Sequence, residues 1–238
     1  MTANSEVELT KARQSFALLY EISRAVVSSR YLEEILTLIV GLTAEMIGSN
    51  ICSLMLLDEK NQELVIKATQ SLSEAYRSKP PIKVGESVSG RAVQLRKTIT
   101  VSDVRKETGY KYPEIARREG LVSLVAVPMR IKDRVIGVLN CYTAEERTFK
   151  KEEIQLLQGV ANHAALAIEN TQLLAEKVAV QEALESRKKV ERAKAILMKR
   201  CHVKEDEAYR MLQKQSMDKR RSLKEIAEAI ILSEEIGN

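Results

Sequence analysis

The strongest chemical signal in the chain is a run of positive charge near its C-terminus. Between Arg187 and Lys224 the sequence holds 14 lysines and arginines against five acidic residues, a net charge of +9 over 38 residues. The whole chain of 238 residues carries +5, so the remainder sums to about −4. Concentrated positive charge favours a polyanionic partner, because each neutralised phosphate releases counterions. Charge alone leaves a solvated basic helix face open as the alternative.

Residues suited to catalysis or metal binding are sparse. The two histidines, His163 and His202, lie in different segments, and no serine or cysteine has an evident catalytic base nearby in sequence. The three cysteines, Cys52, Cys141 and Cys201, are far apart and lack CxxC spacing, which predicts reduced thiols in a cytoplasmic protein. We therefore expect a structural role for His163, and we expect no enzyme activity, no metal and no cofactor.

Hydrophobic periodicity predicts the elements that hold these residues. Residues 11–47 show the spacing of two helices, and a further helix begins at Phe149. Apolar runs of strand length stand at 51–57, 63–69, 98–101, 121–129 and 134–142. This order predicts an α+β domain with a largely antiparallel sheet and flanking helices.

The chain from Phe149 to Ile236 has no proline and a single glycine, which predicts a long helix leaving the sheet domain. Along it, Leu166, Leu173 and Val180 lie seven residues apart, and Leu184 follows four residues later. This is an imperfect two-stranded coiled-coil seam, and it predicts a homodimer. A lone amphipathic connector packed on the sheet is the alternative.

The last three helices are expected to form a small bundle. Ser222 and Glu225 have the spacing of a capping box at the start of the third helix. The cations follow these helices, since Arg187 and Lys194 lie seven residues apart on one helix face.

The larger part of the chain, about residues 15–175, resembles the GAF family of small-molecule sensor domains. The matching segments are GESVSGRA at 85–92, VSDV at 101–104, VAVP at 125–128, VIGVL at 135–139 and the helix from Phe149 to Asn170. The resemblance implies a ligand pocket between the sheet and the loop at 110–119. Its expected lining residues are Val88, Thr98, Tyr110, Tyr112 and Val125. A GAF domain with no ligand and a purely structural role stays open, and the sequence names no ligand.

Some GAF relatives are free methionine sulfoxide reductases that use clustered cysteines. Here Cys52 and Cys141 fall on expected sheet strands and Cys201 lies in another domain. We therefore expect Cys52 and Cys141 to be buried structural thiols rather than reactive ones.

The basic stretch resembles the ANTAR family, the RNA-binding domain of bacterial transcription antiterminators. The matching residues are AL at 183–184, Arg187, AK at 193–194, ILM at 196–198, EDEAY at 205–209, Leu212, MD at 217–218, Arg221, Leu223 and IA at 226–227. Two departures are visible, because Ala195 replaces a usual glycine and another glycine is missing near Cys201–His202. The RNA contacts that we expect are Arg187, Lys194, Arg200, Tyr209, Lys214 and Arg221.

Together these features predict a short tail at 1–14, a GAF domain at 15–165, a coiled-coil helical linker at 166–182 and an all-α three-helix ANTAR bundle at 183–238. The resemblance implies a cytoplasmic, homodimeric transcription antiterminator. It would bind paired hairpins in nascent mRNA and prevent terminator formation, in response to a signal at the GAF domain. The alternative is a ligand-responsive DNA-binding regulator, since three small helices can also form a helix-turn-helix.

Overall fold

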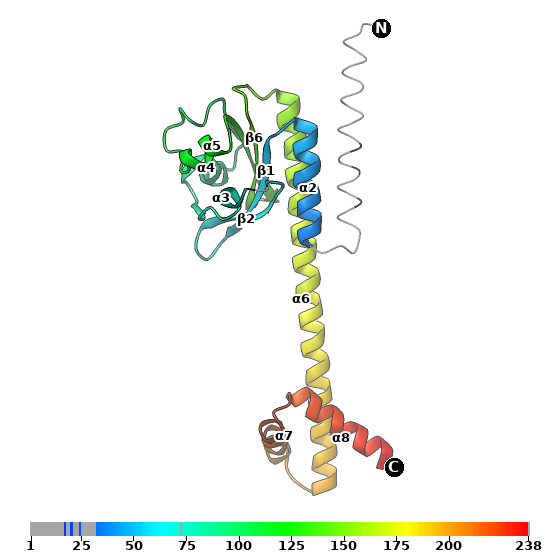
Figure 1. Cartoon of the computed structure of the whole chain (residues 1–238). Coiled ribbons are helices and arrows are strands. Elements are labelled where there is room, and N and C mark those ends of the chain that lie inside the picture. Colours follow the sequence, from blue (N-terminus) through cyan, green and yellow to red (C-terminus); the bar gives the residue numbers. More distant parts are fainter. Residues whose placement is uncertain (1–16, 18–19, 21–23, 25–31, 72, 238) are drawn as a thin grey trace. The chain divides into compact units, whose positions relative to one another are not determined.

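The structure is a computed structural model that describes residues 17, 20, 24, 32–71 and 73–237 (Figure 1). It divides into two compact units, one ending at Thr171 and the other beginning at Gln172. The first of the two helices expected within residues 11–47 falls largely outside the described residues.

The N-terminal unit is built on one antiparallel sheet of six strands in the order β3-β2-β1-β6-β5-β4. The strands are β1 Ile51–Asp58, β2 Glu63–Thr69, β3 Ile82–Lys83, β4 Ile99–Val101, β5 Ser123–Ile131 and β6 Arg134–Thr143. Every long strand lies within two residues of its predicted bounds. The expectation of an antiparallel α+β domain is confirmed.

Local polar groups form the hairpin between β1 and β2. The Asp58 carboxylate accepts hydrogen bonds from the backbone N–H groups of Lys60 and Asn61, at 3.0 and 3.1 Å. On β5, Pro128 lies beyond the short strand β4, which pairs only with residues 124–126. The missing N–H of this proline therefore leaves no partner in β4 unsatisfied.

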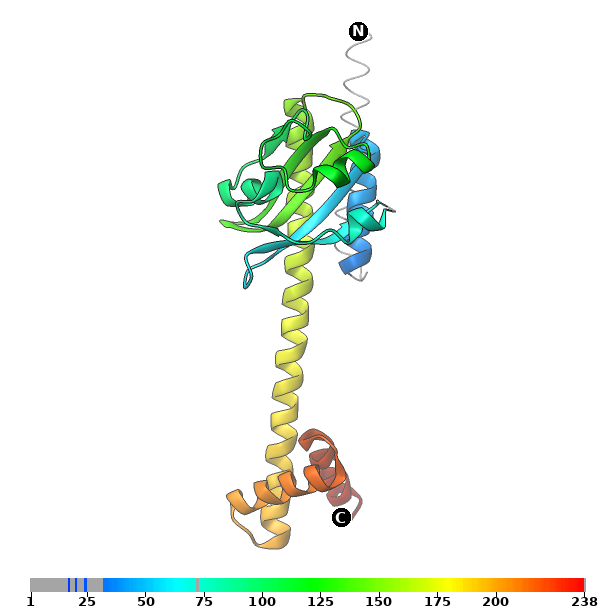
Figure 2. The same cartoon turned by 60° about the vertical axis from the view of Figure 1, so that its left-hand side comes forward.

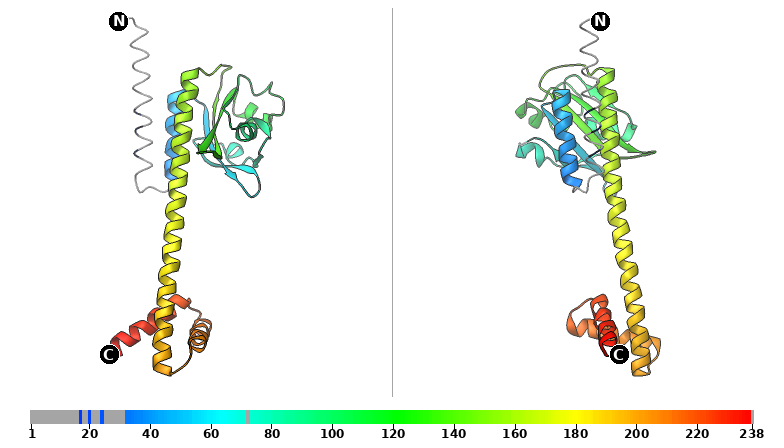
Figure 3. Two further views of the ribbon diagram at one scale, coloured as in Figure 1. Left: turned by 180° about the vertical axis from the view of Figure 1, so that it is seen from behind. Right: turned by 90° about the vertical axis from the view of Figure 1, so that its right-hand side faces the viewer.

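Helices cover both faces of the sheet. One face carries α2 Leu32–Ile47 and the first part of α6 Lys151–Cys201, which run side by side (Figures 1 and 3). The other face carries α3 Glu74–Arg77, α4 Ser87–Leu95 and α5 Pro113–Arg118 (Figure 2). Because side chains alternate along a strand, Val125 points into the α2–α6 core, whereas Leu124 and Ala126 point into the opposite core.

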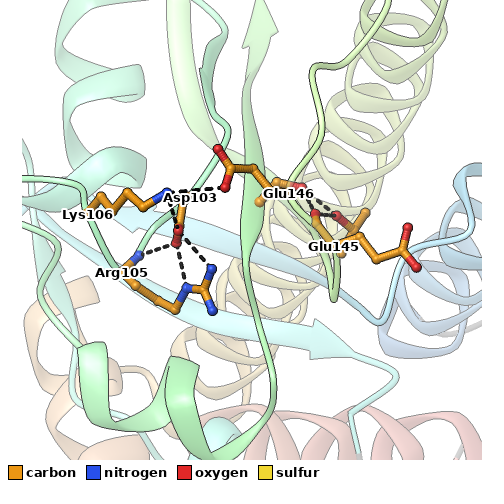
Figure 4. Close-up of polar contacts among 7 residues, drawn as sticks. Asp103, Arg105, Lys106, Glu145 and Glu146 are labelled. Carbon is orange, nitrogen blue, oxygen red and sulfur yellow. Dashed lines mark hydrogen bonds and ion pairs between the residues drawn. The ribbon is translucent and has the colours of Figure 1, made fainter.

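A buried carboxylate orders the loop that follows β4. Asp103 accepts hydrogen bonds from the backbone N–H and the guanidinium of Arg105, and the Lys106 ammonium lies 3.2 Å from both Asp103 and Glu146 (Figure 4). Hydrogen bonding to Arg105 lowers the pKa of Asp103. Since Glu146 lies between β6 and α6, this cluster ties the loop after β4 to that connection.

The C-terminal unit contains the last part of α6, α7 Glu205–Lys219 and α8 Leu223–Gly237. Two non-glycine residues in the turns, His202 and Arg220, have left-handed φ angles of 56° and 51°. The turn after α6 thus keeps the conformation that favours glycine, although the glycine itself is missing. The predicted capping box is confirmed, because Glu225 N–H donates to Ser222 Oγ and Ser222 N–H donates to Glu225.

Candidate nucleic-acid interface and sensor interior

The three C-terminal helices pack around a small apolar centre, as the sequence predicted. Ala193 of α6, Leu212 of α7 and Ala227 of α8 are fully buried there. Partly buried residues surround them: Val190, Leu197, Leu223, Ile226, Ile230 and Ile231. Small residues at the centre let the helices approach closely, and the longer side chains close the edges.

Acidic side chains of α8 neutralise one side of α6. Lys189 Nζ lies 2.6 Å from Glu228, and Arg192 Nη2 lies 2.8 Å from Glu235. Both pairs are partly exposed, so they contribute modestly to stability. Their electrostatic effect is local cancellation, which leaves this side of the unit poorly suited to a polyanion.

Lys194 has a different environment from the other cations. Its ammonium lies 2.9 Å from Glu191 and 2.7 Å from Glu205, and only 11% of its side chain is exposed. Hydrogen bonds to these two carboxylates raise its pKa. Glu205 opens α7, so Lys194 connects α6 to the first turn of α7.

A second set of cations in the three-helix bundle, from residue 183 onward, is exposed and has no ion-pair partner among the described residues. The set comprises Arg187, Lys199, Arg200, Lys204, Arg210, Lys214, Lys219 and Arg220. These side chains come from α6, from α7 and from the turns beside α7. They are the groups that a phosphate backbone can approach without displacing a carboxylate.

Large apolar side chains stand exposed along the middle of α6. Leu166, Leu173 and Val180 are 51%, 55% and 69% exposed, and Leu184 is also exposed. They repeat along one face of a helix that runs unbroken from Lys151 to Cys201. A row of apolar residues in water is typical of a helix surface that meets a partner.

Polar side chains occupy the centre of the sheet face that α3 and α4 cover. Ser53 and Asn140 are direct strand partners, and both are fully buried. The Ser53 and Tyr76 hydroxyls lie 2.8 Å apart, and Ser89 donates to Asn140 Oδ1 at 2.9 Å. Within the described structure, Asn140 Nδ2 is a buried donor without a partner. An unsatisfied buried amide is costly, and a bound polar group would satisfy it.

A lysine joins this interior without a carboxylate partner in the described part of the chain. The Lys79 ammonium lies 4.0 Å from the centroid of the buried Tyr76 ring. Burial lowers its pKa from 10.5 to about 7. A cation–π contact only partly replaces the lost water, so the charged form of Lys79 is disfavoured.

Two protein families match consecutive parts of the chain. The GAF domain matches residues 29–169, more than half of the sequence, and the ANTAR domain matches residues 179–231. The chain belongs to the GAF family and carries an ANTAR domain after it. GAF domains are sensor domains, and ANTAR domains are RNA-binding antitermination domains.

Curated relatives match about two thirds of this chain over a small fraction of their own length. The methyl sulfide methyltransferase-associated sensor of Methanosarcina acetivorans is 28% identical over 174 residues, which cover 70% of this chain and 17% of that protein. The phosphoenolpyruvate-dependent phosphotransferase system protein of Escherichia coli is 25% identical over 157 residues, 66% of this chain and 21% of that protein. The chain therefore spans about a fifth of the length of these relatives.

Solved structures show the same fold for the GAF domain. The GAF domain of a phosphoenolpyruvate-protein phosphotransferase from Coxiella burnetii has a TM-score of 0.63 at 25% identity, over 69% of this chain and 98% of that one. The free methionine-R-sulfoxide reductase of Neisseria meningitidis has a TM-score of 0.59 at 21% identity, over 67% and 91% of the two chains.

The expected RNA contacts of the ANTAR domain fall into two groups. Arg187, Arg200 and Lys214 belong to the exposed, unpaired set, whereas Lys194 and Arg221 each have a carboxylate partner. Tyr209 is 38% exposed, with its neighbour Ala208 buried in the bundle. Helix-face spacing and the ANTAR resemblance together predicted Lys194 as an RNA contact. In the structure its ammonium pairs with Glu191 of α6 and Glu205 of α7.

The expected ligand residues of the GAF domain do not share one pocket. Val88 packs in the core beneath α4, and Tyr110 and Tyr112 pack against the same core. Val125 lies in the core on the opposite face of the sheet, and Thr98 accepts a hydrogen bond from Gln158 of α6. Sequence reasoning missed Ser53 and Asn140, because a polar residue in an apolar strand gives no sign of which face it occupies. It also missed Tyr76 of α3 and Lys79 just after that helix.

GAF sensor and ANTAR regulator domains are typically non-enzymatic, although some GAF relatives, such as the reductase above, are enzymes. Cys52 and Cys141 are buried strand partners with sulfur atoms 3.5 Å apart, and burial raises the pKa of Cys52. His163 Nδ1 donates to the Gly159 carbonyl. In the described ranges, no three metal-ligating side chains form a metal-binding set. No described helix is both long and apolar enough to cross a bilayer.

We expect Lys194→Met to weaken the ANTAR fold rather than to remove a phosphate contact. The substitution leaves Glu191 and Glu205 close together without their cation, so the melting temperature should fall. The salt dependence of RNA binding should stay near the wild-type slope. Arg187→Ala, on the same face and unpaired, is the matched control and should flatten that slope by roughly 0.7–0.9. A flattened slope with unchanged melting in Lys194→Met would contradict this assignment.

We expect the stability of the GAF domain to rise between pH 7 and pH 9 because of Lys79. Folding lowers the pKa of Lys79 from 10.5 to about 7. Between these values the unfolded chain binds more protons, so the free energy of unfolding increases with pH. Lys79→Met should remove this increase and stabilise the domain at pH 7. Melting curves at several pH values test this, with the exposed Lys67→Met as control; an unchanged pH profile in Lys79→Met would count against it.

Proposed function

We propose that this chain is a homodimeric transcription antiterminator that binds paired hairpins in nascent mRNA in the cytoplasm. Each ANTAR domain would hold one hairpin, so that the competing terminator hairpin cannot form. The observation that supports this most directly is the set of exposed cations around α7, including Arg200, Arg210 and Lys214, which have no carboxylate partner among the described residues. On the side of α6 that meets α8, by contrast, Glu228 and Glu235 neutralise Lys189 and Arg192.

The exposed apolar face of α6 supports the paired arrangement. Two chains joined through Leu166, Leu173 and Val180 would present two ANTAR domains on one assembly. Binding of the first hairpin then raises the effective concentration of the second, which strengthens binding without any new contact. A single ANTAR domain would lack this gain.

The GAF domain would supply control by binding a small molecule. Asn140 Nδ2, a buried donor without a partner among the described residues, and the Lys79 ammonium over Tyr76 favour a polar ligand with an acceptor group. A ligand that binds only the folded domain raises its melting temperature. A thermal shift screen with small cytoplasmic metabolites tests this step. A screen without any shift, on protein free of co-purified molecules, would favour the structural GAF domain instead.

The DNA-binding alternative predicts a different nucleic-acid preference. Sequence-specific RNA binding uses unpaired loop bases, whereas a helix-turn-helix reads the major groove of a duplex. The turn from α7 to α8 has no glycine, but Arg220 takes the left-handed conformation there. The turn by itself therefore does not separate the two functions.

A mobility shift assay separates them directly. At equal salt concentration, we expect the full chain to bind a tandem-hairpin RNA more tightly than duplex DNA of the same sequence. Lys214→Ala should reduce the slope of log affinity against log salt by roughly 0.7–0.9, because one phosphate contact is lost. Lys189→Ala is the matched control, since Glu228 already pairs with Lys189. Equal or tighter binding to duplex DNA would reject the antiterminator proposal.

A further inference from the structure

A groove opens on the surface of the ANTAR domain between the last turns of α6, the second half of α7 and α8. Its volume is about 490 Å³, within the range of small-molecule sites. Four apolar side chains make its floor: Leu197, Ile226, Ala229 and Ile230. A surface of this kind favours the binding of a flat apolar group of moderate size.

The rim of the groove is positively charged. Arg200 and Lys219 are exposed and have no ion pair to the described chain, and Arg221 shares the rim with its partner Glu225 at 2.9 Å. An apolar peptide would leave these cations unused. A nucleotide matches both parts of the site, because its base is flat and apolar on its faces and its phosphates are anionic.

Two polar side chains also line the groove, and neither makes a hydrogen bond within the described structure. The Gln215 amide offers a donor and an acceptor, and the Ser233 hydroxyl offers both roles in one group. Amide side chains pair with the edge of a base through two hydrogen bonds. Exposed bases also stack on surfaces other than aromatic rings, so the scarcity of aromatic residues is no obstacle.

We propose that this groove holds one unpaired base of the RNA loop. The base lies on Ile226 and Ala229, Gln215 reads its edge, and Arg200 and Lys219 hold the adjoining phosphates. This inference rests on the proposed RNA-binding function and assigns it a specific site. A base in the groove is splayed out of the hairpin loop, as single-stranded recognition requires.

Filling the groove tests the inference. Ala229 is exposed on α8, so Ala229→Leu occupies the groove with a good helix former and leaves the bundle core intact. We expect the full chain to bind hairpin RNA about 10- to 100-fold more weakly, because a stacked base is lost. The salt slope should stay unchanged, because no phosphate contact is lost. Ala229→Ser keeps the groove open and should bind within about 2-fold of wild type.

An abasic scan of the loop supplies the second arm. One abasic RNA position should weaken binding to the wild-type chain by the same factor as the Ala229→Leu substitution does. The same abasic RNA should bind the Ala229→Leu chain with little further loss of affinity. The two losses then share one contact. The inference would be overturned if Ala229→Leu binds RNA with wild-type affinity, or if its loss of affinity adds to the loss at every abasic position. A change of oligomeric mass in Ala229→Leu would also overturn it. If the wild-type chain prefers duplex DNA, the proposed function itself fails.

Discussion

A full-length chain with Leu173→Glu should run as a monomer and lose about 100-fold or more in affinity for RNA with two hairpins. Leu173 is 55% exposed and stands between Leu166 and Val180 on the same face of α6. A carboxylate at this point of a paired seam would be buried without a counterion, which opposes association. The loss of affinity follows because the two ANTAR domains no longer bind as one unit. Light scattering and mobility shifts measure the two effects.

The comparison with single-hairpin RNA makes this test specific. Binding of one hairpin should change little in Leu173→Glu, because the substitution lies outside the ANTAR bundle. Gln172→Glu introduces the same charge on the neighbouring exposed residue, away from the seam, and should leave the dimer intact. A wild-type chain that is monomeric at micromolar concentration, with and without RNA, would refute the seam.

Gly137→Ala should lower the stability of the GAF domain by about 3 kcal/mol. Gly137 lies in β6 opposite Leu56 of β1 and Met129 of β5. An added Cβ would overlap the Met55 carbonyl oxygen and the end of the Met129 side chain. The carbonyl belongs to the backbone of a central strand and cannot move aside cheaply. The melting temperature should therefore fall by about 10 °C.

The same substitution in α2 should have the opposite sign. At Gly41 an added Cβ meets no described atom within 4 Å. Alanine is favoured over glycine inside a helix by roughly 0.5–1 kcal/mol, so Gly41→Ala should raise the melting temperature slightly. Calorimetry of both variants beside the wild type checks the pair. Equal melting of Gly137→Ala and wild type would show that the strands can spread at little cost.

Regular elements were predictable because each follows a local rule. The strand at 63–69 has the predicted bounds, and the capping box of Ser222 and Glu225 fixes the start of α8. Local pattern and tertiary packing agree at these places, so the sequence sufficed.

The sites were less predictable because they depend on pairing across elements. The basic stretch recognised in the sequence ends at Lys224. The acids that neutralise Lys189 and Arg192 come later in the chain, at Glu228 and Glu235. Strand alternation separates Val125 from Leu124, but only the packed helices show which face each one meets. The groove beside Ala229 is formed by three helices together, and no sequence spacing reveals it.

Under the proposed function, the ion pairs between α6 and α8 have a consequence for how the protein would search for its RNA. Ribosomal and transfer RNA outnumber any one transcript. Every unpaired cation lengthens the time for which the protein stays bound to these non-target RNAs. Non-specific affinity grows steeply with the number of phosphates neutralised. By keeping Lys189 and Arg192 in contact with Glu228 and Glu235, α8 withholds two charges from that competition. A chain without those acids would hold bulk RNA longer and find its own transcript more slowly.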